Sequence, residues 1–350
     1  MNSLRQNKFR TTVLVFIIIF LSTTINAVEI NDLAGRQIEI PEKIDKIAAV
    51  GPGALRLVVY LEAAEKVVGI EEFEKRNQKR PYILAEKELL KLPVIGPQFG
   101  GDAELIAAQN PDLIIASYLT KAQINTLQKK TAIPVISINN GSPGSMTEKE
   151  FKKALIFLGG ILKKEKRAEE LINYFNQSKL ELKSRTAAAD TSLTVYIGGI
   201  GNKGAQGITS TESNYPPFAY LDLRSIIEES DKNNFTISKE QLLLENPDLI
   251  FIDQGGIELV KNDLKREEFK YLKSYQKNNI YQLLPYNHYT TNFATMLADA
   301  YYIAKIIYPE EFENLKVEEK ADQIYKKFVG RAVYTEMAEI FGGFKKMDLK

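Results

Sequence analysis

The 350-residue sequence contains no cysteine and a single histidine, His288. Without cysteine the chain forms no disulfide, has no catalytic thiol and offers no site for a lipid anchor, so neither a thiol enzyme nor a lipoprotein is expected. Soft transition metals are bound mainly by several imidazole or thiolate groups, which one histidine cannot supply. A bare zinc or manganese site is therefore not expected.

An excess of positive charge is also absent. The 46 Lys and Arg residues are balanced by 45 Asp and Glu residues, which leaves a net charge of +1. A nucleic-acid surface requires clustered positive charge that displaces counterions. Basic stretches such as residues 163–167 are interleaved with acids and are typical of solvated helix faces. No nucleic-acid partner is expected, and the length allows two domains with separate cores.

An uninterrupted apolar run occupies residues 13–21. Arg5, Lys8 and Arg10 precede it, and small polar residues ending in Ala27 follow it. This order is typical of a secretory signal peptide, and the run is shorter than the ~20 residues of a membrane-spanning helix. Cleavage after Ala27 would give a freely diffusing periplasmic protein; the alternative is an uncleaved N-terminal anchor.

Short apolar runs of β type alternate with amphipathic segments along the rest of the chain. Such alternation favours an α/β fold with mainly parallel sheets flanked by helices. Helices are predicted at residues 54–64 and 121–131. The predicted strands are residues 46–50, 67–70, 112–116, 134–138, 193–198, 248–253 and 279–284.

A charged segment without proline runs from Thr147 to Ala189, with apolar residues at helical spacing. The pair Gly159-Gly160 is expected to split or bend it, leaving residues 166–187 as one helix. About 20 helical residues span ~30 Å, enough to link two lobes. The predicted organisation is a signal peptide (1–27), an N-terminal lobe (28–165), a linking helix (166–189) and a C-terminal lobe (190–350).

The two parts of the chain contain one repeated segment. Residues 102–115 and 238–251 share Glu, Asn, Pro, Asp and Leu at equal offsets. Each reads as a short helix capped by Asp102 or Ser238, an Asn-Pro-Asp stop and a buried strand. The alternative is a chance repeat, because any α/β protein can repeat helix and strand. We interpret the repeat as two related lobes with a ligand cleft between them.

Several segments in this order resemble the helical-backbone class of periplasmic binding proteins, which serve ABC importers of iron–siderophore complexes, haem, cobalamin and some oxyanions. The resemblance covers residues 28–328. The segments that carry it are Asn-Asp-Leu-Ala-Gly-Arg at 31–36, Ile38, Ile40-Pro41, Lys-Ile-Ala-Ala-Val at 46–50, Val-Val-Gly-Ile at 67–70, the two Asn-Pro-Asp-Leu-Ile segments and residues 286–309.

The resemblance implies two lobes on a single long helix, small hinge motions and no catalytic activity. It implies a small-molecule ligand, a permease dimer with a cytoplasmic ATPase as partner, a monomeric state and no intrinsic cofactor. In cobalamin-type members one surface glutamate per lobe docks on the permease, and Glu104 and Glu240 match by position in the repeat. The alternative role for each is an acid favoured by the helix dipole.

Ligands of open α/β sheets bind beyond the carboxyl ends of the parallel strands. Gly51-Pro52-Gly53 follows the first predicted strand and opens a helix whose amides could face an anion; a tight turn is the alternative. The other strand-end loops are residues 117–118, 139–141, 199–217 and 253–256. The candidate ligand residues there are Pro52, Gly53, Tyr118, Asn139, Tyr215 and Gln254.

The richest candidate is the loop at residues 285–292, which follows a predicted strand and precedes a patterned helix. We expect Thr290 or Thr291 to cap that helix. Packing is the alternative role for its aromatic residues. The candidate ligand residues are Tyr286, His288, Tyr289, Thr290, Thr291 and Asn292, and Tyr286, His288 or Tyr289 could contact a metal directly.

An iron chelate or haem is the favoured ligand, because aromatic walls and tyrosinate suit ferric iron. A tetrahedral oxyanion such as molybdate or tungstate, bound by amides and hydroxyls, and a cobalamin-like corrinoid are the alternatives. Lys203 is the main basic candidate. A function outside transport is an exported enzyme that uses His288 as a general base. The sequence near His288 has neither a Ser/Asp arrangement nor paired carboxylates to support it. A scaffold or adhesion protein is a third class.

Overall fold

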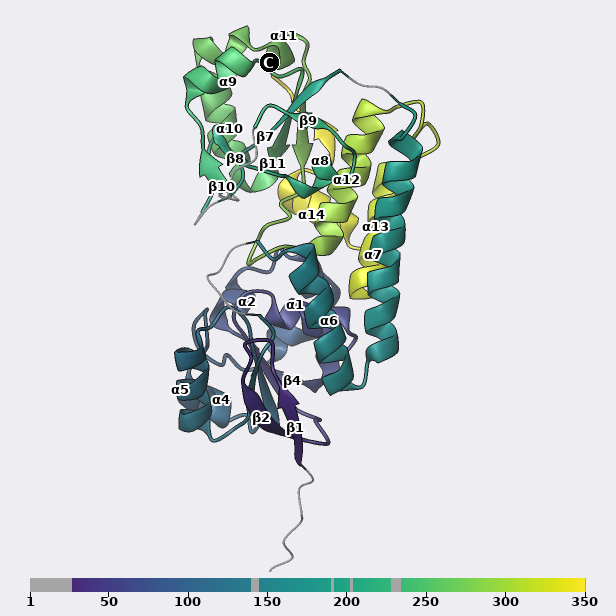
Figure 1. The fold of residues 1–350 in the computed structure, drawn as a ribbon. Helices are drawn as coiled ribbons and strands as arrows, with labels where there is room; N and C mark the ends of the chain where they lie inside the picture. The colour runs from purple at the N-terminus through teal and green to yellow at the C-terminus, as the bar shows by residue number, and fades with distance from the viewer. Residues whose placement is uncertain (1–26, 140–144, 190–191, 202–203, 228–233, 350) are drawn as a thin grey trace, which may run out of the picture.

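The computed structural model describes residues 27–139, 145–189, 192–201, 204–227 and 234–349. Two α/β halves lie one beyond the other, and helix α7 (Glu165–Thr186) runs beside both of them (Figure 1). The predicted signal peptide and Lys203 lie outside the described residues. No helix within the described ranges combines the length and apolarity needed to cross a membrane.

The first half contains a four-stranded parallel sheet in the order β4-β3-β5-β6. Its β3 and β5 strands are wholly buried, as expected for Val- and Ile-rich strands covered on both faces. All four predicted strands are confirmed. The bounds are β3 (Ile47–Val50), β4 (Val67–Gly69), β5 (Leu113–Ala116) and β6 (Val135–Ser137).

An antiparallel hairpin that was not predicted precedes this sheet. In its second strand Ile38 and Ile40 are buried while Gln37 and Glu39 are exposed, which is the alternation of a strand with one face on the core. Its strands are β1 (Ala27–Asn31) and β2 (Gln37–Pro41).

Short helices connect these strands. Helix α5 has its predicted bounds and a capping box between Thr120 and Gln123. Helix α1 ends at Tyr60, earlier than predicted, and Glu62 takes a left-handed conformation with φ of 53°. The elements are α1 (Ala54–Tyr60), the 3-10 turn Ala64–Lys66, α2 (Glu72–Arg76), α3 (Pro81–Ala85), the 3-10 turn Lys87–Lys91, α4 (Ala103–Ala107) and α5 (Lys121–Thr131).

The second half contains a five-stranded sheet in the order β13-β12-β11-β7-β9. Strands β12, β11, β7 and β9 are parallel, and β13 is antiparallel to β12. The three strands predicted here are confirmed as β7 (Thr194–Gly198), β11 (Leu249–Asp253) and β12 (Ile280–Leu283). The other strands are β9 (Arg224–Ser225), β13 (Lys345–Lys346) and the antiparallel pair β8 (Ser210–Glu212) and β10 (Asn234–Thr236).

Helix α12 is buried on nearly all sides, and α13 reaches back to contact α1 and α3 of the first half. Buried side chains of both halves join in one continuous apolar cluster, so the lobe boundaries stay a prediction. The helices of the second half are α8 (Pro216–Ala219), α9 (Lys239–Glu245), the 3-10 turn Gln254–Gly256, α10 (Ile257–Leu264), the 3-10 turn Glu267–Tyr271, α11 (Lys273–Gln276), α12 (Phe293–Ile307), α13 (Val317–Val329) and α14 (Tyr334–Phe341).

The charged segment is divided into two helices, as expected, but the division does not fall at the glycine pair. Helix α6 (Glu148–Leu162) continues through both glycines, and Lys163, with φ of 57°, caps its end. A Cβ atom on Gly159 would lie 2.9 Å from the Cβ atom of Ala168 on α7. The glycine therefore allows α6 and α7 to approach closely. The long linking helix is present as the 22 residues of α7.

The repeated segment has a physical basis in the structure. Asp102 accepts hydrogen bonds from the amides of Glu104 and Leu105, and Ser238 accepts one from Gln241, so both predicted caps are confirmed. The aspartate of each Asn-Pro-Asp stop binds the start of the neighbouring strand. Asp112 accepts from the amide of Lys46 at 2.8 Å, and Asp248 accepts from the amide of Thr194 at 3.0 Å.

Candidate functional site

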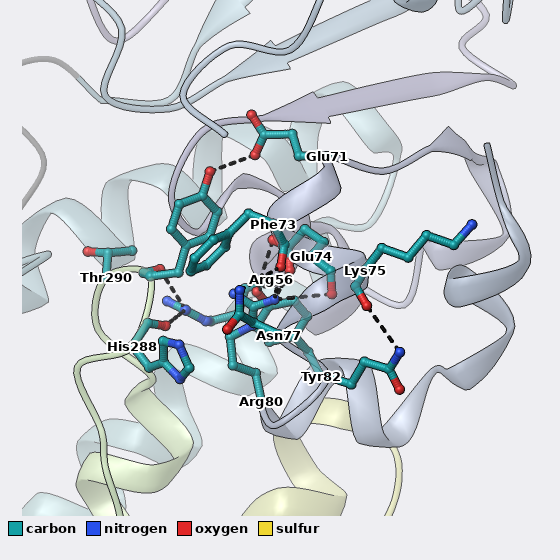
Figure 2. Close-up of polar contacts among 12 residues, drawn as sticks. Arg56, Glu71, Phe73, Glu74, Lys75, Asn77, Arg80, Tyr82, His288 and Thr290 are labelled. Atoms are coloured by element: carbon teal, nitrogen blue, oxygen red, sulfur yellow. Dashed lines mark hydrogen bonds and ion pairs between the residues drawn. The ribbon is translucent and has the colours of Figure 1, made fainter. Parts of the chain in front are cut away.

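Residues 285–292, called here the bridging loop, leave the second sheet after β12 and contact the first half. The guanidinium group of Arg56 on α1 donates to the carbonyl oxygens of Thr291 at 2.5 Å, His288 at 3.0 Å and Tyr289 at 2.8 Å. Arg56 is only 1% exposed, and none of the ion pairs among the described residues involves it. The bridging loop is thus fastened to a buried cation (Figure 2).

Side chains of the bridging loop add to this attachment. The hydroxyl of Thr291 accepts from the amide of Met146 at 2.9 Å and donates to its carbonyl at 3.2 Å. Asn287 donates to Ser145 at 2.9 Å. The predicted helix cap is wrong, because Asn292 holds the N-cap position of α12 and its side chain donates back to the carbonyl of Tyr286. The threonines serve the contact between the halves instead.

The two tyrosines of the bridging loop point to opposite halves. Tyr289 donates a 2.6 Å hydrogen bond to Glu71 of the first half, and its ring lies 4.4 Å from that of Phe73. Tyr286 donates to Glu212 of the second half, and its ring lies 5.7 Å from that of Tyr215. The phenols therefore do not gather on one ligand, as the sequence had suggested.

Burial governs the ionisation of these pairs. Loss of hydration raises the pKa of Glu71 to about 7 and that of Glu212 to about 8. It also raises the pKa of Tyr286 and Tyr289 far above the ordinary tyrosine value, and the neighbouring carboxyls raise them further. Both phenols keep their protons at neutral pH, so neither is a ready tyrosinate ligand.

His288 is half-buried among cations. Burial lowers its pKa to about 4, and the positive charges of Arg80, Arg56 and Lys79 act in the same direction. Its ring lies 6.1 Å from that of Phe73, edge to face. The imidazole is therefore neutral at pH 7, which does not match the poised base near pH 7 that catalysis favours.

Arg80 is a second buried arginine next to the bridging loop. It is 1% exposed and forms a 2.5 Å ion pair with Glu74. Aromatic rings surround its guanidinium group, with ring centroids at 4.9 Å for Phe73 and 5.6 Å for Tyr289. Two of its nitrogens, and Nε of Arg56, lack a hydrogen-bond partner among the described residues. The charge of Arg80 is thus balanced by Glu74, whereas none of the ion pairs among the described residues involves Arg56.

Sequence reasoning missed both arginines. Arg56 is the one charged residue in α1, three positions after Gly53, and a lone charge in an apolar helix beside a strand-end turn was the available signal. Arg80 precedes Pro81 in a charged stretch and carried no such signal. The expectation that Lys203 is the main basic candidate is untested, because it lies outside the described residues.

Glu71 was also missed, although the strand-end rule would have found it. It follows β4 by two residues, at the carboxyl edge of the first sheet. One carboxylate oxygen accepts hydrogen bonds from the amides of Gly51 and Gly100, each at 3.0 Å, and the other accepts from Tyr289. Amides of two loops and a hydroxyl of a third thus converge on one carboxyl group.

The predicted residues of the first half do lie beside the bridging loop. A Cβ atom on Gly53 would lie 2.7 Å from Cγ2 of Thr290, so glycine permits this close approach. The carbonyl of Pro52 accepts from Ser117 at 2.6 Å. Among the described residues, this places Pro52, Gly53 and Thr290 together.

Tyr118 and Asn139 are joined to each other at the neighbouring strand ends. The side-chain oxygen of Asn139 accepts from the amide of Tyr118 at 2.6 Å. The Tyr118 hydroxyl and the Asn139 amide nitrogen are buried and lack hydrogen-bond partners among the described residues. Tyr118 also interacts with the side chains of Thr290 and Asn139, so these residues link the strand ends to the bridging loop.

In the second half, Gln254 lines a cavity of about 800 Å³. Its side-chain nitrogen donates to Gln282 at 3.0 Å and to the carbonyl of Gly343 at 2.8 Å. Lys79 of the first half also lines the cavity. The remaining walls are Ala205, residues 255–259, Lys261, Gln282, residues 339–342 and residues 345–348. The cavity therefore lies between the two halves.

Three carboxyls are buried near the bridging loop in the second half. Burial raises the pKa of Glu212 to about 8, that of Asp253 to about 7 and that of Asp299 well above its ordinary value. Tyr215 is packed against Phe218 with ring centroids 4.8 Å apart, so it belongs to the core. No cluster of His, Cys, Asp and Glu suited to a metal ion occurs within the described residues.

The sequence model of the family described as "Periplasmic binding protein" matches residues 47–286. The chain belongs to this family. The molybdate-binding protein MolA of Haemophilus influenzae is 20% identical over 321 residues, covering 85% of this chain and 90% of MolA. A periplasmic location and a role in transport follow from the family.

Solved structures show the same two-lobed fold. MolA bound to molybdate superposes with a TM-score of 0.69 at 18% identity, covering 87% of this chain and 98% of MolA. A periplasmic solute-binding protein of Veillonella parvula gives a TM-score of 0.71 at 19% identity, with 90% and 97% coverage. CeuE of Helicobacter pylori in a nickel–histidine complex gives 0.64 at 17% identity, with 90% and 99% coverage. At these low sequence identities, the similarity shows that the fold is shared.

Glu104 and Glu240 are both exposed, in the first turns of α4 and α9. In the view of Figure 1 both helices lie on the side of the molecule away from α7. This placement leaves both carboxylates accessible to a large partner, and their docking role stays a prediction.

Proposed function

We propose that this binding protein captures a small oxyanion, of the class that includes molybdate and tungstate, and delivers it to the permease of an ABC importer. One observation carries the choice of ligand: Arg56 is a buried cation outside every ion pair among the described residues. A buried charge without a counterion is costly, and an anion nearby would offset that cost. The similarity to MolA, a molybdate-binding protein, supports the same class.

The available polar groups suit an oxyanion better than ferric iron. An oxyanion is bound by amides, hydroxyls and fixed positive charge, which the loops beside Arg56 and Arg80 supply. A bare ferric ion would favour a tyrosinate ligand, whereas the phenols of Tyr286 and Tyr289 keep their protons and donate hydrogen bonds to glutamates. The polar groups of the bridging loop therefore favour an oxyanion over ferric iron as the ligand.

A metal chelate is the second candidate. The cavity of about 800 Å³ between the halves has room for an organic ligand, and Lys79, Lys345 and Lys346 would attract an anionic one. An iron–siderophore complex, haem or a cobalamin-like corrinoid would occupy this cavity rather than the buried arginines. Catalysis is not proposed, because neutral His288 lies among arginines instead of beside an orienting carboxylate.

We further infer that the first 27 residues act as a cleaved signal peptide and that the mature protein is a monomer. It would dock on a permease dimer, with its ATPase in the cytoplasm, through Glu104 and Glu240. The matching helix starts in the two halves support this arrangement, since one acid in each half would meet one subunit of a symmetric dimer.

Calorimetric titration of the ligand-free protein with molybdate, tungstate, ferric chelates, haem and cobalamin tests the ligand class. Molybdate or tungstate should bind and raise the melting temperature, because a ligand that binds only the folded state adds to its stability. Lys79→Ala should weaken oxyanion binding at low salt, whereas Lys91→Ala, at an exposed lysine paired with Glu88, should not. Binding of a chelate without any oxyanion binding would contradict the proposal.

A further inference from the structure

Three hydrogen-bond donors from separate segments surround the carboxylate of Glu71. The amide of Gly51 comes from the turn after β3, the amide of Gly100 from the loop before α4, and the hydroxyl of Tyr289 from the bridging loop. Glu71 itself is 1% exposed. A carboxyl group with two oxygens thus occupies the point where the two halves meet.

The direction of these donors is fixed by the backbone. Gly51 and Gly100 have φ of 85° and 129°, conformations that residues with a Cβ atom rarely adopt. A Cβ atom on Gly51 would also lie 2.1 Å from the carbonyl oxygen of Ser117. Preset backbone amides and a hydroxyl form the kind of site that binds oxyanions, because they need no proton transfer and no rearrangement of their own.

No cation among the described residues stabilises the charge of Glu71. The titratable groups that act on Glu71 are Tyr289 of the bridging loop and Glu74 of α2, while the Gly51 turn and the Gly100 loop contribute amides. Glu74 forms an ion pair with Arg80, and none of the ion pairs among the described residues involves Glu71. Burial raises the pKa of Glu71 to about 7, so its own charge is held at a cost.

We propose that Glu71 is an internal occupant of the oxyanion site and competes with the ligand for the donors of Gly51, Gly100 and Tyr289. An arriving oxyanion takes these donors when the Glu71 side chain and residues 97–101 move aside. This inference rests on the proposed function and adds the atoms that bind the ligand. It also predicts an unusual result, since removing a buried acid strengthens anion binding.

Calorimetric titration with molybdate tests the competition. Glu71→Gln should bind molybdate about tenfold more tightly than the wild type at pH 7.5, because an uncharged occupant competes less and does not repel the anion. Wild-type affinity should rise as the pH falls through 7, and the variant should show a flat profile. Glu72→Gln, at the half-exposed neighbour that pairs with Arg76, should match the wild type.

A second pair of variants decides the question even if Glu71→Gln does not fold. Tyr289→Phe removes one donor and should weaken molybdate binding about tenfold. Tyr196→Phe, which removes a buried phenol that donates to Ile208 in the second half, should leave affinity unchanged. Unchanged or weaker binding by Glu71→Gln, or unchanged binding by Tyr289→Phe, would overturn this inference alone. Absence of oxyanion binding in the wild type at every pH would overturn the proposed ligand as well.

Discussion

Arg56 and Tyr289, which are 233 positions apart in the chain, are joined by a 2.8 Å hydrogen bond from the guanidinium group to the backbone carbonyl. The same group also bonds the carbonyls of His288 and Thr291. One side chain of α1 therefore holds three peptide groups of the bridging loop. This contact adds to α7, α13 and the shared apolar cluster, which also connect the halves.

Replacing Arg56 should destabilise the whole protein. Hydrogen bonds to charged groups contribute about 1.5–3 kcal/mol each, and Arg56→Met leaves three carbonyls without this partner. We expect a loss of at least about 2 kcal/mol in the free energy of unfolding, measured by denaturant titration. Arg76→Met removes an exposed ion pair with Glu72 and should cost less than about 1 kcal/mol. Equal effects of the two variants would contradict the role of Arg56.

The paired glycines of α6 should respond in opposite directions to alanine. A Cβ atom on Gly159 would lie 2.9 Å from that of Ala168, so Gly159→Ala forces α6 and α7 apart and should cost about 1–3 kcal/mol. Gly160 has no atom within 4 Å of such a Cβ, and Gly160→Ala should stabilise the helix by about 0.5–1 kcal/mol. Thermal unfolding of both variants measures the difference, and changes of the same sign would refute the packing argument.

Stability of the ligand-free protein should fall as the pH rises from 5 to 8. Burial raises the pKa of Glu212 to about 8, whereas an unfolded glutamate ionises near its ordinary value of 4.5. The folded state therefore holds a proton that the unfolded state has lost, and this contribution is full below pH ~4.5 and lost by pH ~8. Glu71 and Asp253, each with a pKa raised to about 7, act in the same direction.

Glu212→Gln isolates one part of this dependence. The amide oxygen can still accept from Tyr286, but the side chain no longer titrates. The fall in melting temperature between pH 5 and pH 8 should shrink by about 2 °C or more in this variant. A profile identical to that of the wild type would show that Glu212 is not protonated in the folded state.

Features that depend on contacts between neighbouring residues in the chain were predictable from the sequence, whereas features that depend on distant residues were not. The seven predicted strands and α5 follow local apolar patterns and capping residues, and they lie within one or two residues of the predicted bounds, whereas the shorter strands and the first hairpin were not predicted. The repeated segment predicted both helix caps. What failed was the assignment of the glycine pair, because a close contact between helices and a helix stop both use glycine.

The site was less predictable, because its contacts join distant segments. The strand-end rule selected the loops of Gly53, Tyr118 and Asn139; Gly53 lies against Thr290 of the bridging loop, and Tyr118 and Asn139 are joined to each other, while their contact with a ligand stays a prediction. It could not show that Tyr286 and Tyr289 face opposite halves, since that depends on which glutamate each one meets. Arg56 and Glu71 belong to the candidate site because both bond to Tyr289 of the bridging loop. That residue lies more than 200 positions away from each of them in the chain.

Charge reversal at Glu104 and Glu240 tests the docking role. Glu104→Lys with Glu240→Lys should abolish uptake in cells while the purified protein keeps its ligand affinity, because neither exposed carboxylate touches the bridging loop. Loss of rim charges acts mainly on association rate and its salt dependence. Glu169→Lys, at an exposed position on α7, is the matched control. Normal uptake by the double variant would rule out docking through these residues.

Strand β13 has a consequence for behaviour at high concentration. It consists of Lys345 and Lys346 alone and pairs antiparallel with Tyr281 and Gln282 of β12. Without it, β12 would present an open row of amides and carbonyls to which a strand of another molecule could add. Two exposed lysines on a strand of two residues close that edge with charge, which protects the protein against sheet-to-sheet aggregation.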